Sequence, residues 1–137
     1  MNARRKARVT ALQALYEFDC TKHGVEDILA RLVSEEALPQ EALSFSVELV
    51  KGVLRNMPKL DDLIKRFAPA FPLEQMSVID KNILRIAIFE ILFDNTPTKV
   101  AINEAVELAK DFGSASSPRL INGVLGSLVT EYGKTIK

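Results

Sequence analysis

The most informative stretch of the chain is ILRIAIFEILF, from Ile83 to Phe93, which is apolar at nearly every position. Only Arg85 and Glu90 interrupt it. A helix with one apolar side lies on a surface, whereas a helix that is apolar all round is covered on all sides. We therefore expect a helix that ends near Phe93 and lies at the centre of a bundle formed by the second half of the chain.

Two more helices are expected after this segment. The turn sequence DNTP at 94–97 leads into the helical pattern VAINEAVELAKDF, which Gly113 stops. A small polar loop follows. Ser117 and Pro118 are then typical of the N-cap and first turn of a last helix, which we expect to extend to about Tyr132.

Four helices are expected before the central segment. Lys22-His23-Gly24 breaks the first, the second runs from about Val25 to Ala37, and Pro39 suits the first turn of the third. Asn56-Met57-Pro58 separates the third from the fourth. The apolar residues that recur at helical spacing, and that we expect to face inward, are Leu12, Leu15, Tyr16, Ile28, Leu29, Leu32, Leu43, Val47, Val50, Leu54, Leu60, Leu63, Ile64 and Phe67.

The chain is expected to form one domain. Its 137 residues suffice to bury a core, and no stretch shows the convincing alternation of a strand. Prolines at 69 and 72, within FAPAFPLEQMS, mark the best boundary between two halves. The sequence thus predicts an all-α fold of seven helices in two packed bundles, with residues 1–137 as one domain and sub-bundles at about 1–68 and 73–137.

Composition excludes several classes of protein. A single cysteine, Cys20, excludes an internal disulfide framework. No apolar run approaches the roughly 20 residues that span a bilayer. The N-terminus has neither the apolar core nor the cleavage motif of a signal peptide. We expect a cytoplasmic protein that keeps its N-terminus and does not enter a membrane.

Positive charge gathers at the start of a chain that is neutral overall, with 18 basic and 18 acidic residues. The basic residues there are Arg4, Arg5, Lys6 and Arg8. On a helix the three arginines share one sector with the inward apolar residues, and we expect them to emerge past the core as a positive prong. Cations at this position oppose the helix dipole by roughly 0.3–1 kcal/mol each. The segment is either a frayed, solvated terminus or a polyanion site, which Tyr16, Lys99 and Arg119 would extend if the fold brings them close.

No arrangement of residues points to catalysis. Asp19, Cys20 and His23 amount to half a zinc site, because no second pair closes a tetrahedron. His23 is the only histidine, so no serine or cysteine has a base to activate it. Glu104 and Glu107 are spaced as an acid–base pair would be, although such glutamates are more often solvated. We expect no catalytic residue, no metal and no cofactor.

Two residue pairs in the last two helices are expected to serve packing. Gly123 and Gly126 match the GxxG of a KH loop, but a KH domain needs strands. At helical spacing such glycines more often let another helix approach closely. Asn103 and Asn122 stand among apolar neighbours. Since an unpaired buried amide costs about 1–3 kcal/mol, we expect both to be buried and hydrogen-bonded between these helices.

Several stretches resemble the NusB family of transcription antitermination factors. They are ARRKAR-x-x-A-x-QALY at the start, LVKGV at 49–53, IDKNILRIAIFEIL, KVAINEAVELAKDFG and the NGVL of the last helix. The resemblance covers nearly the whole chain, and INEAVELAK combined with NGVL is highly specific. It implies two helical bundles, no catalysis, and binding to boxA RNA of ribosomal RNA leader transcripts together with the ribosomal protein NusE, within an elongation complex that holds other Nus factors. The same fold precedes the catalytic domain of some rRNA methyltransferases, but this chain ends at Lys137.

The resemblance also implies which residues meet each partner. RNA would lie against the starts of the first and last helices, at positions that correspond here to Arg4, Arg5, Lys6, Arg8, Ser116, Ser117, Arg119 and Leu120, with Lys99 as an extension. The residues on the NusE side correspond to Tyr16 and Asp80. Many relatives have Phe at the position of Leu120, an acid at that of Ser116 and Trp at that of Phe71. Leucine has no π-face, so we expect weaker base stacking here.

A second function stays open at this point, a protein-only helical scaffold or adaptor with little direct RNA binding. Whether the chain forms a homodimer that hides its RNA face is open as well. Because the positive surface is small, we expect tight RNA binding to require the protein partner. Salt-dependent binding of a boxA-like RNA separates the two functions.

Overall fold

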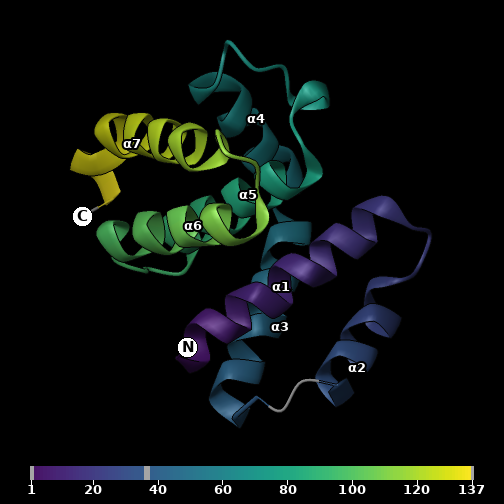
Figure 1. Cartoon of the computed structure of the whole chain (residues 1–137). Coiled ribbons are helices and arrows are strands. Elements are labelled where there is room, and N and C mark those ends of the chain that lie inside the picture. Colours follow the sequence, from purple (N-terminus) through teal and green to yellow (C-terminus); the bar gives the residue numbers. More distant parts are fainter. Residues whose placement is uncertain (1, 36–37, 137) are drawn as a thin grey trace.

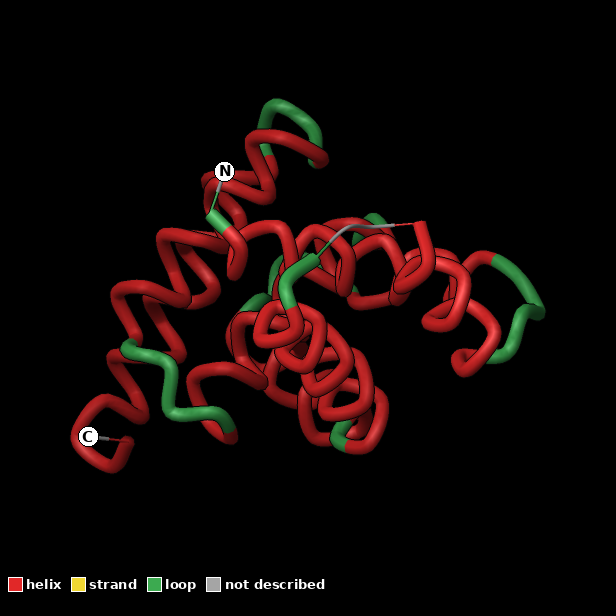
Figure 2. The backbone as a smooth tube through the Cα atoms, turned by 90° about the horizontal axis from the view of Figure 1, so that it is seen from below, coloured by secondary structure: helices red, strands yellow, loops and turns green. Residues whose placement is uncertain are grey.

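The structure, a computed structural model, describes residues 2–35 and 38–136. This part of the chain forms seven α-helices and one short 3₁₀ helix, with no strand (Figures 1 and 2). The elements are α1 (Ala3–Cys20), α2 (Val25–Glu35), α3 (Gln40–Arg55), α4 (Met57–Phe67), η1 (Leu73–Gln75), α5 (Val78–Phe93), α6 (Thr98–Phe112) and α7 (Ser117–Ile136). The predicted all-α fold of seven helices is therefore confirmed.

Helix α5 lies at the centre of the molecule, with α1–α3 on one side and α4, α6 and α7 around the rest (Figure 1). Every residue from Asn82 to Ile91 is buried. The prediction of a central helix that ends near Phe93 is confirmed. Helix α5 was expected to lie at the centre of the second bundle alone, but it also packs against α1 and α3 of the first half.

Two charged residues in the buried middle of α5, Arg85 and Glu90, have ionic partners on other helices. The Arg85 guanidinium donates to both Asp61 oxygens, at 2.8 and 3.0 Å, and to Asp19 Oδ2 at 3.0 Å. Glu90 is 1% exposed and accepts two hydrogen bonds from Arg8, at 2.7 and 2.8 Å. Buried charges are tolerated only when they are paired, so these contacts tie α5 to α1 at two levels and to α4.

Helix α4 packs on α5 and α7, and only weakly on α3. The predicted boundary at 69–72 does not match these contacts, which group α4 with the second bundle. A single residue, Asn56, separates α3 from α4, and its side chain donates to the Gly52 carbonyl at 2.8 Å. Met57 and Pro58 were expected to separate the helices, yet they form the first turn of α4, where a proline costs no hydrogen bond.

The predicted inward faces are correct for most helices and rotated for α3. In α3 the buried apolar residues include Phe45, Leu49 and Val53, whereas the predicted Leu43 and Val47 are only half-buried. The rotation allows the Phe89 ring of α5 to lie directly on Gly52, where any Cβ would collide with it. The inward stripe of α3 therefore depends on a glycine, which periodicity in apolar residues does not detect.

Several side chains and two glycines do not lie where the sequence predicts. Tyr16 is 44% exposed rather than inward. Asn103 and Asn122 are exposed, so the prediction that they are buried between α6 and α7 is wrong. Gly123 and Gly126 face open space rather than another helix.

The ends of three helices can be compared with the predicted ends. The turn before α6 is present and holds Asn95 at a φ of 55°, a left-handed conformation that asparagine tolerates. Helix α7 extends past the expected Tyr132 to Ile136. Helix α2 ends at Glu35, and its predicted end at Ala37 lies outside the described residues. No helix of the described ranges is long and apolar enough to cross a membrane.

Candidate nucleic-acid interface

The start of α1 is well formed rather than frayed. Asn2 is the N-cap residue, and its Oδ1 accepts a hydrogen bond from the Arg5 backbone N–H at 2.8 Å. The helix therefore presents its four basic side chains in fixed directions, and their surroundings differ from one residue to the next.

Arg8 is a core residue. Its side chain is 5% exposed, and its guanidinium forms a two-pronged ion pair with Glu90. The prediction of an exposed prong is wrong for Arg8, because one turn before Leu12 its sector of α1 is still covered by α3 and α5, where Phe45 and Glu90 contact it. A phosphate cannot reach this guanidinium while the pair with Glu90 holds.

Arg5 is also engaged, although nearer to the surface. Its Nε and Nη2 donate to the two Glu104 oxygens at 2.9 and 2.8 Å. The Arg5 hydrogen bond holds the pKa of the Glu104 carboxyl below its ordinary value, and Glu104 in turn raises the pKa of Arg5. Glu104 thus ties α6 to α1, while Glu107 pairs with Lys110 on its own helix.

Arg4 and Lys6 are exposed, and neither has an ion-pair partner in the described part of the chain. The Arg4 guanidinium lies over the Phe45 ring, 3.7 Å from its centroid. Burial raises the pKa of the nearby Asp94 carboxyl, and Glu48 raises it further, whereas Arg4 opposes that shift. The positive surface at the start of α1 therefore consists of two side chains, and one of them adjoins acids.

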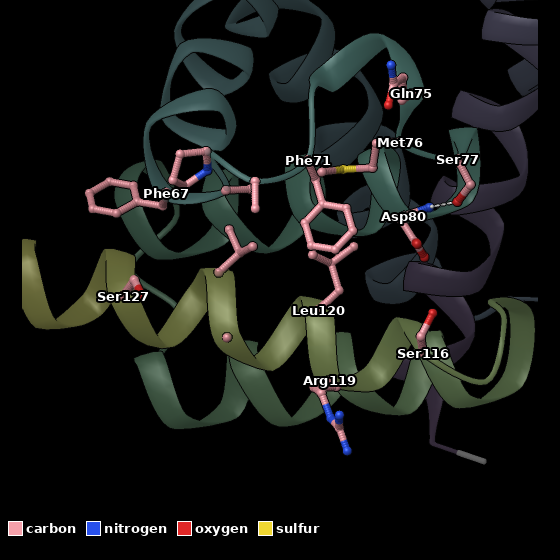
Figure 3. A pocket seen from close by; sticks show the side chains of 15 residues that line it. Phe67, Phe71, Gln75, Met76, Ser77, Asp80, Ser116, Arg119, Leu120 and Ser127 are labelled. Atoms are coloured by element: carbon pink, nitrogen blue, oxygen red, sulfur yellow. Dashed lines mark hydrogen bonds between the residues drawn. The ribbon is translucent and has the colours of Figure 1, made fainter.

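The start of α7 lines a groove of about 670 Å³ that faces the segment between α4 and α5 (Figure 3). Ser116 and Arg119 are exposed and Leu120 is half-buried in its wall. Ser117 is 1% exposed, and its Oγ accepts a hydrogen bond from the Ser114 N–H at 2.9 Å. Ser117 therefore holds the loop before α7, and the prediction that it meets RNA does not fit its burial.

Asp80 lies in this same groove, beside the start of α7. Tyr16 lines a different, smaller groove of about 360 Å³, together with Ile79 and Phe112. The structure thus does not bring the two residues expected on the NusE side into one pocket. It instead places Asp80 among residues predicted to meet RNA.

The two predicted RNA-contact segments are separated along α6. Arg5 is bound to Glu104, whereas α7 begins beyond the end of α6 at Phe112. Those eight positions correspond to about 12 Å of helix. Lys99 is exposed in the first turn of α6, and along this helix it is farther still from the start of α7.

Sequence reasoning missed the aromatic and sulfur-containing walls of the α7 groove. They are Phe67, Phe71 and Met76, from the proline-rich segment that was interpreted as a boundary between bundles. Aromatic residues between prolines, in FAPAFP, are the signal that identifies such a wall.

Two of the three candidate metal ligands, Asp19 and His23, have protein partners, whereas Cys20 is free and exposed. Asp19 accepts hydrogen bonds from Arg85 and Asn82. His23 contacts Glu17 at 2.8 Å, and this hydrogen bond, followed by that from Arg31, lowers the pKa of the Glu17 carboxyl. Among the described residues no group of three or more His, Cys, Asp or Glu side chains is placed to hold a metal ion.

Comparisons with known proteins agree on one family. The NusB family model matches residues 5–130. Transcription antitermination protein NusB of Dehalococcoides mccartyi strain CBDB1 is 54% identical over 92% of this chain and 89% of its own, and that of Roseiflexus sp. strain RS-1 is 48% identical over 94% and 93%.

Solved structures show the same likeness. T. maritima NusB superposes with a TM-score of 0.86 at 32% identity, covering 93% of this chain and 91% of that one. A chain from a crystal structure of antitermination factors NusB and NusE with double-stranded RNA has a TM-score of 0.86 at 22% identity. The match covers 96% of this chain and 99% of that one and shows a shared fold. The helical fold, the family match over most of the chain and these relatives lead to one conclusion: the protein belongs to the NusB family.

Proposed function

We propose that this protein is a transcription antitermination factor that binds boxA RNA of ribosomal RNA leader transcripts together with the ribosomal protein NusE. Family membership supports the proposal, since the relatives are named transcription antitermination proteins and one structural neighbour is a NusB–NusE complex with RNA. The role is binding rather than catalysis. It is carried out in the cytoplasm, within an elongation complex that contains other Nus factors.

One observation carries the RNA half of the proposal. Arg4 and Lys6 are held exposed at the start of a well-capped helix, although cations there oppose the dipole, while Arg5 and Arg8 between and beside them are neutralised by glutamates. Binding of an external anion would explain why cations are kept at a helix end where the dipole disfavours them. Phosphates of an RNA backbone are such an anion, and they release counterions on contact.

Tyr16 carries the protein half. It is exposed in an apolar groove that also includes Phe112, which is 42% exposed, and Ile79. Exposed aromatic side chains beside a shallow apolar hollow are typical anchors of protein interfaces. We assign this groove, rather than Asp80, to NusE.

The alternative function is a protein-only scaffold, and one observation favours it. Two of the four basic residues at the start of α1 already have glutamate partners, which leaves little positive surface for RNA. A homodimer that covers the Tyr16 groove would fit the same alternative.

Titration of labelled boxA RNA at several salt concentrations tests the proposal, with the pure protein and with NusE present. A scrambled RNA of the same composition is the control. We expect weak, salt-dependent binding alone and tighter, boxA-selective binding with NusE. Equal affinity for boxA and scrambled RNA in both series would contradict the proposal and favour the scaffold.

A further inference from the structure

The start of α1 lies beside α6, and a carboxylate of α6 holds one of its cations (Figure 1). The Arg5 Nε and Nη2 atoms donate to the two oxygens of Glu104, at 2.9 and 2.8 Å. Arginine binds a phosphate through the same pair of parallel hydrogen bonds. Glu104 therefore occupies an edge of Arg5 that an RNA phosphate could use, and it would repel a phosphate that met the other side of the guanidinium.

This ion pair is open to solvent, unlike its neighbour one turn along α1. The side chains of Arg5 and Glu104 are 34% and 15% exposed, whereas those of Arg8 and Glu90 are 5% and 2% exposed. Water competes for a partly exposed pair, so such a pair is weakly held. Opening a desolvated pair leaves a charge buried without its partner, which is costly. Of the two pairs, that of Arg5 and Glu104 is the one that an incoming phosphate can open.

The fold does not require the negative charge of Glu104. Its Oε1 also lies 3.8 Å from Arg8 Nη1, but Arg8 already donates two hydrogen bonds to Glu90. A neutral side chain at position 104 would leave no buried cation without an anion, because Arg8 keeps Glu90 and Arg5 reaches water. Helix α6 is held mainly by α5 and α7. The charge of Glu104 thus lowers the positive charge of the α1 surface without being needed for packing.

Other acids of α6 lie on the same side of the helix but contact Arg5 less directly. Glu107 and Asp111 follow Glu104 at spacings of three and four, and so they share its face. The Glu104 hydrogen bond raises the pKa of Arg5 most, and the charges of Glu107 and Asp111 raise it further. Glu107 has its own ion-pair partner, Lys110, at 3.1 Å. Glu104 is therefore the acid of this face whose removal would change Arg5 most.

We infer that Glu104 restrains RNA binding at the start of α1, because its carboxylate competes with an RNA phosphate for the Arg5 guanidinium. The inference rests on the proposed RNA binding and adds a residue that opposes it. Phosphate contacts carry no information about base sequence, so this restraint weakens the binding of every RNA alike. As a result the free protein binds little RNA of arbitrary sequence, and tight binding depends on the further contacts that boxA and NusE supply.

The test is Glu104→Gln in the full chain, since the amide keeps the size of the side chain and removes its charge. Labelled boxA RNA and scrambled RNA are titrated over a range of salt concentrations, with and without NusE. We expect both RNAs to bind about two- to fivefold more tightly at low salt, which is the effect of one exposed ion pair. The slope of log K against log salt should steepen by about 0.7, the value for one phosphate of a single strand.

Two controls separate release of Arg5 from a general change in charge. Glu107→Gln removes the same charge from the same face, but Glu107 pairs with Lys110, so this variant should leave the salt slope unchanged. In an Arg5→Gln background, Glu104→Gln should improve binding by no more than Glu107→Gln does, because there is no guanidinium to release. Circular dichroism checks folding. If Glu104→Gln does not fold, Glu104→Asp withdraws the carboxylate by one methylene and should give a smaller gain in the same direction.

Three results would overturn the inference. They are a gain no larger than that of Glu107→Gln, a gain that persists without Arg5, or weaker RNA binding by Glu104→Gln. The last result would mean that Glu104 orients Arg5 toward the RNA instead of withholding it. In all three the parent protein still binds boxA, so the proposed function stands. Failure of the parent protein to bind boxA with NusE present refutes both.

Discussion

The starts of α1 and α7 form two very different polar surfaces. The start of α1 carries four basic residues, of which Arg5 forms an ion pair with a glutamate of α6 and Arg8 with a glutamate of α5. The start of α7 carries one basic residue, Arg119, beside a groove lined by Asp80, whose Oδ1 has no hydrogen-bond partner among the described residues. The first surface has several charged side chains but no groove, and the second has a groove but only one basic side chain. A cluster of charge in a sequence therefore does not show how much of that charge faces solvent.

The strongest way to test this contrast is to break the core pair at the start of α1. Arg8→Ala leaves Glu90 buried without its counter-charge, and we expect the free energy of unfolding to fall by about 3–5 kcal/mol. Urea denaturation measures this change. Lys6→Ala is the matched control on the exposed side and should stay within about 0.5 kcal/mol of the parent protein.

Replacing both members of the pair should recover much of that loss, since Arg8→Met with Glu90→Leu leaves neither of these two charges buried without its partner. If Arg8→Ala instead unfolds like the parent protein, Arg8 is not a core residue and the two surfaces differ less than the structure indicates.

The second test concerns the start of α7. Ser117→Ala removes the acceptor of the Ser114 N–H, and we expect a loss of about 1 kcal/mol in thermal or urea unfolding. Ser116→Ala, one residue away and exposed, should change stability by less than about 0.5 kcal/mol. Equal losses in the two variants would mean that neither serine is specifically structural.

The third test uses pH and the pair between Arg5 and Glu104. Because the pKa of Glu104 is lowered in the folded protein, its contribution is present above the ordinary value of 4.5 and disappears as the pH falls through the lowered value. Glu104→Gln should therefore be less stable than the parent at neutral pH, and the gap should close in acid. Glu107→Gln is the control, since within the described residues the ion-pair partner of Glu107 is Lys110 of its own helix. A gap that persists unchanged at low pH would contradict the ion pair.

The smallest effect on folding is expected for the exposed cations. Arg4→Ala with Lys6→Ala should leave the free energy of unfolding within about 0.5 kcal/mol of the parent. The same double variant should flatten the slope of log K against log salt for boxA RNA by roughly one to two units. Unchanged slope and affinity would remove the start of α1 from the interface.

Local pattern was enough to predict the helices. The apolar run of α5, the turn around Asn95 and the stop at Gly113 appear where the sequence predicts them. These features depend on residues within a few turns of one another, and so they are present in the order of the amino acids. The family was equally accessible, because its motifs are contiguous stretches.

Polar residues are where local pattern failed. Arg8 was assigned to solvent and is buried, while Asn103 and Asn122 were assigned to the interior and are exposed. The partner of Arg8, Glu90, is 82 residues away, and that of Arg5, Glu104, is 99 residues away.

Amino-acid order alone was therefore sufficient for the seven helices, the central position of α5 and the concentration of cations at the start of α1. Packing between distant helices settled which cations are neutralised, to which bundle α4 belongs, and that Asp80 faces the groove beside α7. The physical reason is that helix formation and amphipathicity arise from near neighbours. The cost of burying a charge depends instead on whether another segment supplies its partner, and that is decided when the segments pack.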